Sequence, residues 1–373
     1  MHYGYKVKYI PRRHYGERKL AKTMKAAVKT AQGDFEIKEV PVPEITRPDY
    51  VLVKVRSVGI CGSDLHSWKV PRPEATGRIT GHELAGDIVA VGRDVTNVKV
   101  GDRVGIDSVI SCGKCYWCKV GQDHLCPQCF AIRGETFARG FSEYVVGPSE
   151  KCYKLPDHVG YAEAAIMDVY GTSVHAIART YTHMNQKVVI FGAGPIGLSL
   201  LDLVNVTGAK GIITDIIDGP LEFARNTIGA YATINSKKED PVEKVLELTD
   251  GRGADIVFEC VGGGAGPYLL PQAVDMVRRK GQIALIGALR PGAALTVDWQ
   301  KLQWGEVDIV PVSGFYHWGN DPEFGIVTDL LIDGKLHATD LITHRFPLEK
   351  INEAFEAAAN KAVSKAIKVV IDY

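Results

Sequence analysis

The sequence has little of what marks membrane, secreted or nucleic-acid-binding proteins. No apolar run approaches the roughly 20 residues that a membrane-spanning helix needs, so no membrane partner is expected. The 44 Lys and Arg residues equal the 44 Asp and Glu residues, and a chain without net charge has no overall field that favours nucleic acid. Only eight cysteines occur in 373 residues, and this ordinary number favours a reducing, cytoplasmic compartment.

The first 23 residues differ from the rest, with seven basic residues against the single acid Glu17. No apolar segment follows them, which argues against a secretory signal. A mitochondrial presequence would be basic and poor in acids, but this segment has no serine and a weak amphipathic pattern. Residues 1–23 are therefore interpreted as a basic arm, or as the result of a start codon placed upstream of Met24, and no function is assigned to them.

The remaining length suffices for two domains, each with its own hydrophobic core. Between residues 24 and 155, short apolar or alternating segments are separated by Gly, Pro and Asp, which predicts a mainly antiparallel, barrel-like domain. The expected strands are MKAAVKT (24–30), FEIKEVPVP (35–43), DYVLVKVRSVG (49–59), GDIVAVG (86–92), DRVGID (102–107) and FSEYVVG (141–147). A helical pattern follows over residues 162–178.

From residue 187 onward strands and helices alternate, which predicts a parallel sheet with helices on both faces, and so an α/β fold. The expected strands are 187–191, 211–215, 254–260 and 282–287, with helices over 195–206 and 220–228 between them. Two further helices are expected near 323–332 and 348–360. The last strand, AIKVVIDY (366–373), is expected to return to the first domain.

Four cysteines lie close together in CGKCYWCKVGQDHLC, at Cys112, Cys115, Cys118 and Cys126. Thiolates three residues apart can face one metal ion, and seven intervening residues let the fourth complete a tetrahedron. Zinc favours such an all-sulfur, closed site. Disulfides are the alternative, but two CxxC steps within fifteen residues fit a metal better. The motif predicts a zinc site without an open coordination position.

Residues 191–197 (FGAGPIG) form a GxGxxG motif in a context that gives it weight, after an expected strand and before an expected helix. Gly192 permits the tight turn, Gly194 lets the backbone approach a pyrophosphate, and Gly197 allows close packing of helix on strand. The helix that begins at Pro195 and Ile196 would direct its positive end at the phosphates. The motif predicts a dinucleotide site.

Asp215 ends the second strand of this region, where a carboxylate can accept hydrogen bonds from the adenosine ribose. The same charge would repel a 2′-phosphate, so NAD is expected rather than NADP. The alternative is that Asp215 caps a helix. A second glycine-rich stretch, VGGGAG (261–266), lacks this context and is interpreted as an ordinary loop.

A second pair of potential metal ligands precedes the cysteine motif. Cys61 lies in GICGSDLH (59–66), and His82 lies in GHE (81–83), each expected at the end of a neighbouring strand. Either residue alone is more often part of a core. Together with the cysteine motif and the glycine turn, they form a recognisable set.

This set resembles the zinc-dependent medium-chain alcohol dehydrogenase superfamily, and most closely its sorbitol/polyol and threonine dehydrogenase branch. The resemblance runs from about Met24 to Tyr373 and includes the tail DLITHRFPLEKINEAFE. It implies a GroES-like catalytic domain, residues 24–170 and 315–373, with a structural zinc lobe at about 112–126. A Rossmann domain, residues 171–314, would be inserted in it. Homodimers or homotetramers are also implied.

The resemblance assigns a catalytic zinc to Cys61 and His82. The third ligand falls at Asp168, in MDVYGTSVH, and Glu83 would be a fourth ligand or one that exchanges with water. The alternative for Asp168 is a helix cap or a surface acid. A catalytic zinc keeps a position open for substrate and acts as a Lewis acid while hydride passes to the nicotinamide.

Three of the residues that follow Cys61 match further roles in the family. Ser63 matches the relay hydroxyl beside the substrate oxygen, and His66 the base that passes the proton to solvent, for which an imidazole near neutrality is suited. Asp64 matches the carboxylate that orients the ligand His82. A plain surface histidine is the alternative for His66.

The family's nicotinamide pocket falls on two backbone segments. They are Ile286, Gly287 and Ala288, and Ser313, Gly314 and Phe315. The chain departs from the branch at Pro220, where a basic residue usually contacts the ribose, so the expectation of NAD depends on Asp215 alone. It also lacks the proline that commonly follows the ligand at Asp168.

The sequence thus predicts an oxidoreductase with two zinc ions per chain that transfers a hydride from a secondary alcohol to NAD. Polyols, diols and hydroxy-amino acids are the expected substrates, and Trp68 tilts the choice slightly toward polyols. The alternatives are an NADP-dependent carbonyl reductase of the same family and a non-catalytic dinucleotide-binding sensor. A nucleic-acid-binding zinc module is disfavoured because no extended basic face adjoins the cysteines.

Overall fold

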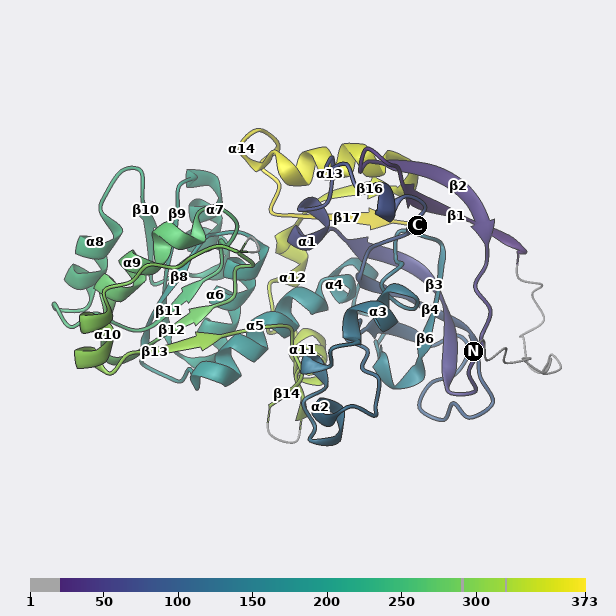
Figure 1. Cartoon of the computed structure of the whole chain (residues 1–373), viewed down its shortest axis with the longest axis horizontal. Helices are drawn as coiled ribbons and strands as arrows, with labels where there is room; N and C mark the ends of the chain where they lie inside the picture. Colours follow the sequence, from purple (N-terminus) through teal and green to yellow (C-terminus); the bar gives the residue numbers. More distant parts are fainter. Residues whose placement is uncertain (1–20, 290–291, 319–320) are drawn as a thin grey trace.

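Two sheets of different kinds organise the chain, one mostly antiparallel and one parallel (Figure 1). The computed structural model describes residues 21–289, 292–318 and 321–373, so the predicted basic arm lies almost wholly outside the described residues. Within the described ranges, no helix combines the length and the apolar character that crossing a bilayer requires.

The first sheet has seven strands in the order β16-β17-β3-β4-β5-β7, with β6 paired to β3, and all its pairs are antiparallel except β16 with β17. A hairpin of β1 and β2 joins it through the Ala27 N–H, which donates to the Phe141 carbonyl over 2.8 Å. The strands are β1 Thr23–Lys29, β2 Phe35–Pro41, β3 Tyr50–Gly59, β4 Glu83–Val91, β5 Arg103–Ile106, β6 Tyr144–Pro148, β7 Cys152–Lys154, β16 Ile342–Pro347 and β17 Lys368–Asp372.

The second sheet has six parallel strands in the order β10-β9-β8-β11-β12-β13, with the order reversing between β8 and β11. Ligands bind at such a switch point in doubly wound sheets. Its strands are β8 Lys187–Phe191, β9 Lys210–Asp215, β10 Ala232–Asn235, β11 Ala254–Glu259, β12 Val277–Leu285 and β13 Asp308–Pro311. The α/β fold class is confirmed: a Rossmann sheet is combined with a GroES-like antiparallel sheet.

Strand β8 shows why the parallel sheet is covered on both faces. Val188 and Ile190 belong to the core shared with α5 and α6, whereas Val189 and Phe191 belong to the core shared with α9. Successive side chains of a strand point to opposite faces, so an uninterrupted apolar run needs a helical layer on each side. The helices of this part are α6 Pro195–Thr207, α7 Asp218–Phe223, α8 Pro241–Leu248, α9 Gly266–Met276 and α10 Trp299–Gly305, with a π turn at Ala224–Ile228.

The remaining helices belong to the first part of the chain and to its return. They are α1 Gly62–Leu65, α2 Tyr116–Lys119, α3 Cys129–Gly134, α4 Tyr161–Ala165, α5 Met167–Thr180, α11 Glu323–Ile332, α12 Ala338–Leu341, α13 Ile351–Ala359 and α14 Lys361–Ser364. Short 3₁₀ turns lie at Pro73–Ala75, Asp123–Leu125, Ser149–Lys151 and Leu348–Lys350, and a small ribbon is made of β14 His317–Trp318 and β15 Asp321–Pro322.

The last strand, β17, pairs with β3, which confirms that the chain returns to its first sheet after the parallel one. The expected helix over 162–178 is interrupted at Ile166, so α4 ends there and α5 begins at Met167. The domain boundaries near residues 170 and 314 stay predictions.

A buried carboxylate joins three segments around α5. Asp202 of α6 is 2% exposed and accepts a hydrogen bond from the Tyr170 hydroxyl of α5 over 2.9 Å. It also faces His337, whose backbone N–H donates over 2.7 Å and whose Nδ1 lies 2.8 Å away. Because α5 carries Asp168, this network fixes the helix that would bring a ligand to the catalytic zinc.

We expect Asp202→Ala to lower the free energy of unfolding by about 3 kcal/mol, because it leaves buried donors without an acceptor. Asp329→Ala removes an exposed carboxylate from α11 and should change stability by less than about 0.5 kcal/mol. Urea unfolding of both variants measures the difference. Equal stability of the two variants would contradict the assigned role of Asp202.

Candidate active site and metal centres

The four cysteines of the lobe converge in space. All four Sγ atoms lie within 4.8 Å of one another, with 3.4 Å between those of Cys115 and Cys118 and 3.9 Å between those of Cys112 and Cys118. A tetrahedral site with zinc–sulfur bonds of about 2.3 Å would place its sulfurs about 3.8 Å apart. None of the cysteines in the described residues forms a disulfide. The donor set therefore fits a closed zinc site.

Two thiols of this lobe have pKa values shifted in opposite directions. Backbone N–H groups of Lys114 and Cys115 lower the pKa of Cys112 to about 6. Although the Cys118 N–H acts in the opposite direction, desolvation and the neighbouring thiols raise the pKa of Cys115 to about 11. Cys112 therefore loses its proton readily, whereas Cys115 keeps it. A bound divalent cation would favour the thiolate form of Cys115 as well.

The lobe is attached to the rest of the molecule through His124. Its ring stacks on Tyr316 at 5.4 Å and meets the edge of His175 of α5 at 5.2 Å. His175 Nδ1 lies 2.9 Å from Oε1 of the fully buried Glu323 of α11. Burial and the charge of His175 lower the pKa of His124 to about 4. No sequence pattern indicates this contact, because its members are far apart along the chain.

Cys61, His82 and Glu83 form a second cluster, with one donor atom of each within 4.8 Å of the others. Cys61 follows β3 and precedes α1, and His82 directly precedes β4. Because β3 and β4 pair antiparallel with Gly59 opposite Glu83, the end of one strand meets the start of the other. A thiolate, an imidazole and a carboxylate are the donor types of catalytic rather than closed zinc sites.

Asp168 lies near this cluster but not within it. It occupies the first turn of α5, and its Oδ2 lies 3.3 Å from the Ser108 hydroxyl, which donates to it. Burial alone would lower the pKa of His82, but the Cys61 thiolate, Asp64 and Asp168 raise it to about 10. The electrostatic effect of Asp168 on His82 supports the assignment of Asp168 to the same site. Its role as a ligand stays a prediction.

The predicted fourth ligand has a partner that sequence reasoning missed. Glu83 is 1% exposed and forms an ion pair with Lys368 of β17. The Lys368 ammonium also donates to the Ile60 carbonyl over 2.9 Å. A Cβ on Gly59 would lie 2.1 Å from Glu83 Oε2, so glycine is required beside this carboxylate. The available signal was a lysine directly before three apolar residues of the final strand.

The short helix α1 carries Ser63 and Asp64, and His66 directly follows it. Asp64 is 7% exposed, and its Oδ2 accepts the Cys61 N–H over 3.1 Å. Burial raises the pKa of Asp64, while the charge of His82 lowers it. Ser63 and His66 are exposed. Among the described residues, neither of these two side chains has a hydrogen-bond partner. Their positions are open to solvent, as a proton relay would require.

The predicted dinucleotide turn has the expected shape. Gly192 has a φ of +92°, and a Cβ on Gly197 would lie 1.8 Å from the Gly192 carbonyl oxygen. At Gly194 the space is open, with only the Lys361 ammonium within 4 Å of the Cβ position. Pro195 opens α6. A cradle of exposed backbone at a helix N-terminus fits a pyrophosphate.

Asp215 organises the loop beside this turn. Its Oδ2 accepts the Ala193 N–H over 2.7 Å, and its Oδ1 accepts the N–H groups of Ile216 and Ile217 over 2.7 and 3.0 Å. The residue at the cap of α7 is Ile217, so the alternative of Asp215 as a helix cap is excluded. The carboxylate faces the glycine turn, as the cofactor prediction requires.

The second glycine stretch is held by a buried acid that the sequence did not single out. Glu259, 2% exposed, accepts the N–H groups of Val261 and Gly262 on Oε1, both over 2.8 Å. Its carbonyl accepts from Ile286 and Gly287 over 2.9 Å each.

This network places the loop beside the residues predicted for the nicotinamide pocket. The Gly263 N–H donates to the Ala288 carbonyl over 2.8 Å. Ser313 and Gly314 are exposed, whereas the Phe315 ring is buried against Gly171 and Phe324.

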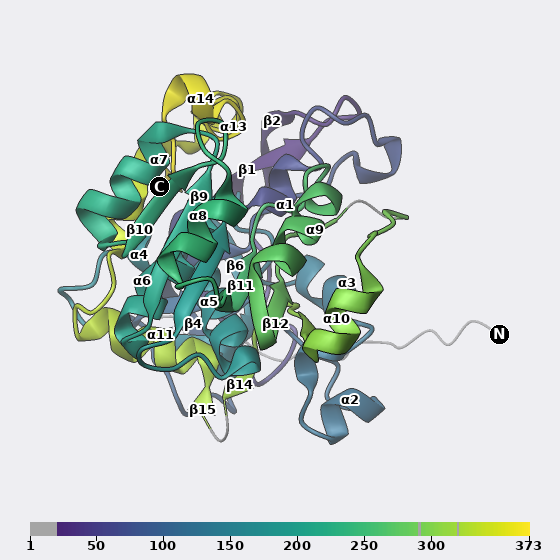
Figure 2. The same ribbon diagram turned by 90° about the vertical axis from the view of Figure 1, so that its left-hand side faces the viewer.

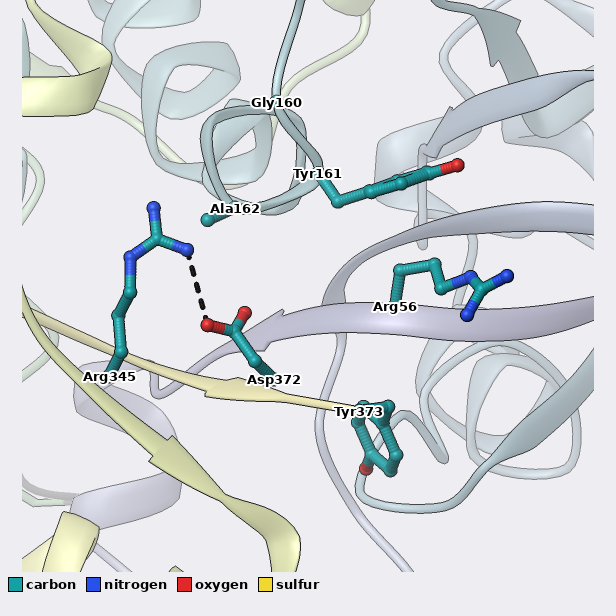
Figure 3. Close-up of a pocket in the computed structure, with 7 residues that line it drawn as sticks. All are labelled: Arg56, Gly160, Tyr161, Ala162, Arg345, Asp372 and Tyr373. Atoms are coloured by element: carbon teal, nitrogen blue, oxygen red, sulfur yellow. Dashed lines mark hydrogen bonds and ion pairs between the residues drawn. The ribbon is translucent and has the colours of Figure 1, made fainter.

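A pocket of about 390 Å³ lies elsewhere in the antiparallel part, and Figure 3 shows its lining. Two arginines approach it, but Arg56 pairs with Asp87 at 2.7 Å and Arg345 with Asp372 at 3.1 Å. None of the predicted site residues lines this pocket. Its cations are already neutralised, so we do not assign it to the active site.

Comparisons with known proteins agree with this arrangement. Residues 47–157 match the alcohol dehydrogenase GroES-like domain, and residues 195–327 match the zinc-binding dehydrogenase family. Sorbitol dehydrogenase of Bacillus subtilis (strain 168) is 34% identical over 357 residues, covering 93% of this chain and 97% of that protein. L-threonine 3-dehydrogenase of Pyrococcus furiosus is 34% identical, covering 90% of this chain and 96% of that protein.

A similar solved structure is a short chain alcohol dehydrogenase of Escherichia coli CFT073 in complex with NADH. The two structures superpose with a TM-score of 0.83 at 28% sequence identity, covering 95% of this chain and 100% of the other. The likeness therefore extends over both sheets.

The two clusters predict two zinc ions per chain that can be removed separately. Cys61→Ala should lose one zinc and keep the lobe intact. Cys115→Ala should lose the other and lower the unfolding temperature by several degrees, because a structural zinc contributes directly to folding. Asp168→Ala should behave as Cys61→Ala. Inductively coupled plasma mass spectrometry of gel-filtered protein counts the ions.

Cys152→Ala is the matched control, since this buried thiol belongs to neither cluster. It should retain both zinc ions. Retention of two ions by Cys61→Ala would show that this residue is not a ligand.

Proposed function

Because this chain belongs to the zinc-dependent medium-chain alcohol dehydrogenase superfamily, we propose that it oxidises a secondary alcohol and transfers the hydride to NAD. The observation that carries the proposal is the cluster of Cys61, His82 and Glu83. Its mixed donor set contrasts with the closed four-cysteine lobe. The family assignment makes the chain an NAD(P)-dependent enzyme of alcohol and carbonyl chemistry; the direction and the substrate are the proposed part.

Cys61, His82 and Asp168 would hold the catalytic zinc, with Glu83 as a further or exchanging ligand. When bound, zinc supplies a Lewis acid that stabilises negative charge on the substrate oxygen. The backbone turn at Gly192–Gly197 would hold the dinucleotide, and the backbone at 286–288 and 313–315 would border its nicotinamide.

The proton and the hydride leave the alcohol by different routes. The Ser63 hydroxyl would accept the proton of the substrate hydroxyl, and His66 would pass that proton to solvent. When bound, the nicotinamide would supply the hydride acceptor, so that the alcohol is oxidised to a ketone. The exposure of Ser63 and His66 supports this route. Asp64 holds the Cys61 backbone and favours the charged form of His82.

We propose NAD rather than NADP because of Asp215. Its carboxylate is fixed by three backbone N–H groups beside the glycine turn. A fixed negative charge at this place disfavours a 2′-phosphate, while its remaining lone pairs can accept a ribose hydroxyl.

For the substrate we propose a polyol, a diol or a hydroxy-amino acid. The support is that relatives at 34% identity are named for sorbitol and for L-threonine. Trp68, the residue that tilts the choice toward polyols, is 9% exposed and packs on Phe355 at 5.8 Å. We also propose a reducing compartment, because the lobe thiols must stay reduced to bind zinc.

The assay of this proposal uses metal-quantified protein with sorbitol, threonine, 2,3-butanediol, inositol and simple secondary alcohols, each with NAD and with NADP. We expect NADH formation with one of these alcohols, and a loss of at least about 100-fold in kcat in Cys61→Ala. Cys61→Ala should still bind NADH, measured by fluorescence titration.

The outcomes separate the alternatives. Turnover confined to NADP and a ketone would favour the reductase. Tight NADH binding with two zinc ions but no turnover of any alcohol or ketone would favour the sensor. Full activity of Cys61→Ala would refute the assigned centre.

We further propose a homodimer or homotetramer. Strand β13 lies at an edge of the parallel sheet, and large apolar side chains are exposed at and near it: Ile309 by 39% and Trp304 by 68%. An exposed edge strand with apolar side chains is normally covered by pairing. Multi-angle light scattering should give a multiple of 40.7 kDa, and Ile309→Lys should reduce it. A monomeric parent protein would contradict the proposal.

A further inference from the structure

Lys361 reaches from the returning end of the chain to the dinucleotide turn. It is the first residue of α14, which follows α13 and precedes β17. Both views place α14 beside α7, at the side of the antiparallel part that faces the parallel sheet (Figures 1 and 2). Its Nζ lies 3.8 Å from the position that a Gly194 Cβ would occupy, and among the described residues beyond Gly194, its chain neighbours and the backbone of its own helix, no other atom lies within 4 Å of that position. An ammonium group therefore faces the opening of the glycine turn.

This ammonium has no partner among the described residues: neither a hydrogen bond nor an ion pair of its side chain is present there, although the residue is half-buried. Two charged groups act on it, and both have other contacts. Lys368 pairs with Glu83 and donates to the Ile60 carbonyl, while Asp215 accepts three backbone N–H groups. Burial and the charge of Lys368 lower the pKa of Lys361, and the charge of Asp215 acts in the opposite direction. A half-buried cation without a direct ion pair or hydrogen bond is stabilised by an anion that contacts it.

We propose that Lys361 binds the pyrophosphate of the dinucleotide from the side opposite the N-terminus of α6, so that residues of both sheets hold the same phosphates. This rests on the dinucleotide cofactor of the proposed function. The second glycine of the turn is where the backbone approaches a pyrophosphate, and the ammonium lies at that glycine. A charge-assisted bond to a phosphate oxygen also supplies the missing counter-ion.

The pyrophosphate is favoured over a 2′-phosphate for two reasons. The ammonium approaches Gly194, the pyrophosphate position of the turn. A 2′-phosphate would instead stand against the carboxylate of Asp215, whose charge opposes it.

Binding of NADH, ADP-ribose and adenosine to the zinc-loaded protein tests the proposal by isothermal titration calorimetry. We expect Lys361→Gln to weaken NADH and ADP-ribose about tenfold or more, since a charge-assisted hydrogen bond is lost. Adenosine, which has no phosphate, should bind equally to both proteins. Lys361→Arg should restore most of the affinity for ADP-ribose.

Lys365→Gln is the matched control, because it removes the same charge four residues away from an exposed position in the same segment. It should change ADP-ribose binding less than twofold. Without ligand, Lys361→Gln should unfold at the same temperature as the parent or higher, because an unpaired cation is removed. The rise in unfolding temperature that NADH produces should shrink.

Each other result overturns the proposal. Equal weakening of adenosine and ADP-ribose would indicate a general effect on the fold. If Lys361→Gln weakened the binding of NADPH alone, Lys361 would be assigned to the 2′-phosphate instead. Unchanged ADP-ribose binding would remove Lys361 from the site. Failure of the proposed function gives a different result, since a parent protein that binds ADP-ribose through Lys361 but oxidises no alcohol would leave this inference intact.

Discussion

The antiparallel pairing of β3 with β4 is the constraint on which the candidate active site depends. Gly59 at the end of β3 stands opposite Glu83 at the start of β4, and the potential ligands Cys61 and His82 lie just beyond these two residues. A shift of the register by one residue would turn the donors to opposite faces. The hydrogen bonds of the sheet thus determine which side chains meet, although none of the donors belongs to the apolar clusters of the core.

Strand β3 also positions the last strand of the chain. β17 pairs with the other edge of β3 and brings Lys368 to Glu83, so the last residues of the chain complete a site that begins near residue 60. Two carboxyl groups, Asp64 and Asp168, and the Cys61 thiol act on the imidazole of His82. Burial lowers the pKa of His82, but these groups together raise it to about 10. A buried set of this kind is balanced either by a proton on the imidazole or by a metal ion, and a metal must displace that proton to bind.

Much of the fold could be predicted because its signals are local. The alternation of strands and helices after residue 187, the glycine turn and the CxxC steps are patterns within short windows, and the structure shows the corresponding elements. The break between α4 and α5 at Ile166 could not be predicted, since no glycine or proline marks it. It arises because α4 packs on the antiparallel sheet while α5 packs on α6 and α11. Glu259 and His124 were missed for a similar reason, because their roles depend on contacts that sequence windows do not contain.

Lys361 and Lys368 show that residue type alone does not predict the role of a side chain. They lie seven residues apart in one segment, and composition counts them alike in a chain of zero net charge. Lys368 is buried in a strand and satisfied by Glu83 and the Ile60 carbonyl. Lys361 begins a short helix and faces the open side of Gly194, and it has no ion pair or hydrogen bond of its side chain among the described residues. A buried cation is stable only where its charge is balanced. Lys368 is therefore balanced within the protein, whereas the proposed partner of Lys361 is an anion from outside. This difference would separate a structural cation from a ligand-binding one.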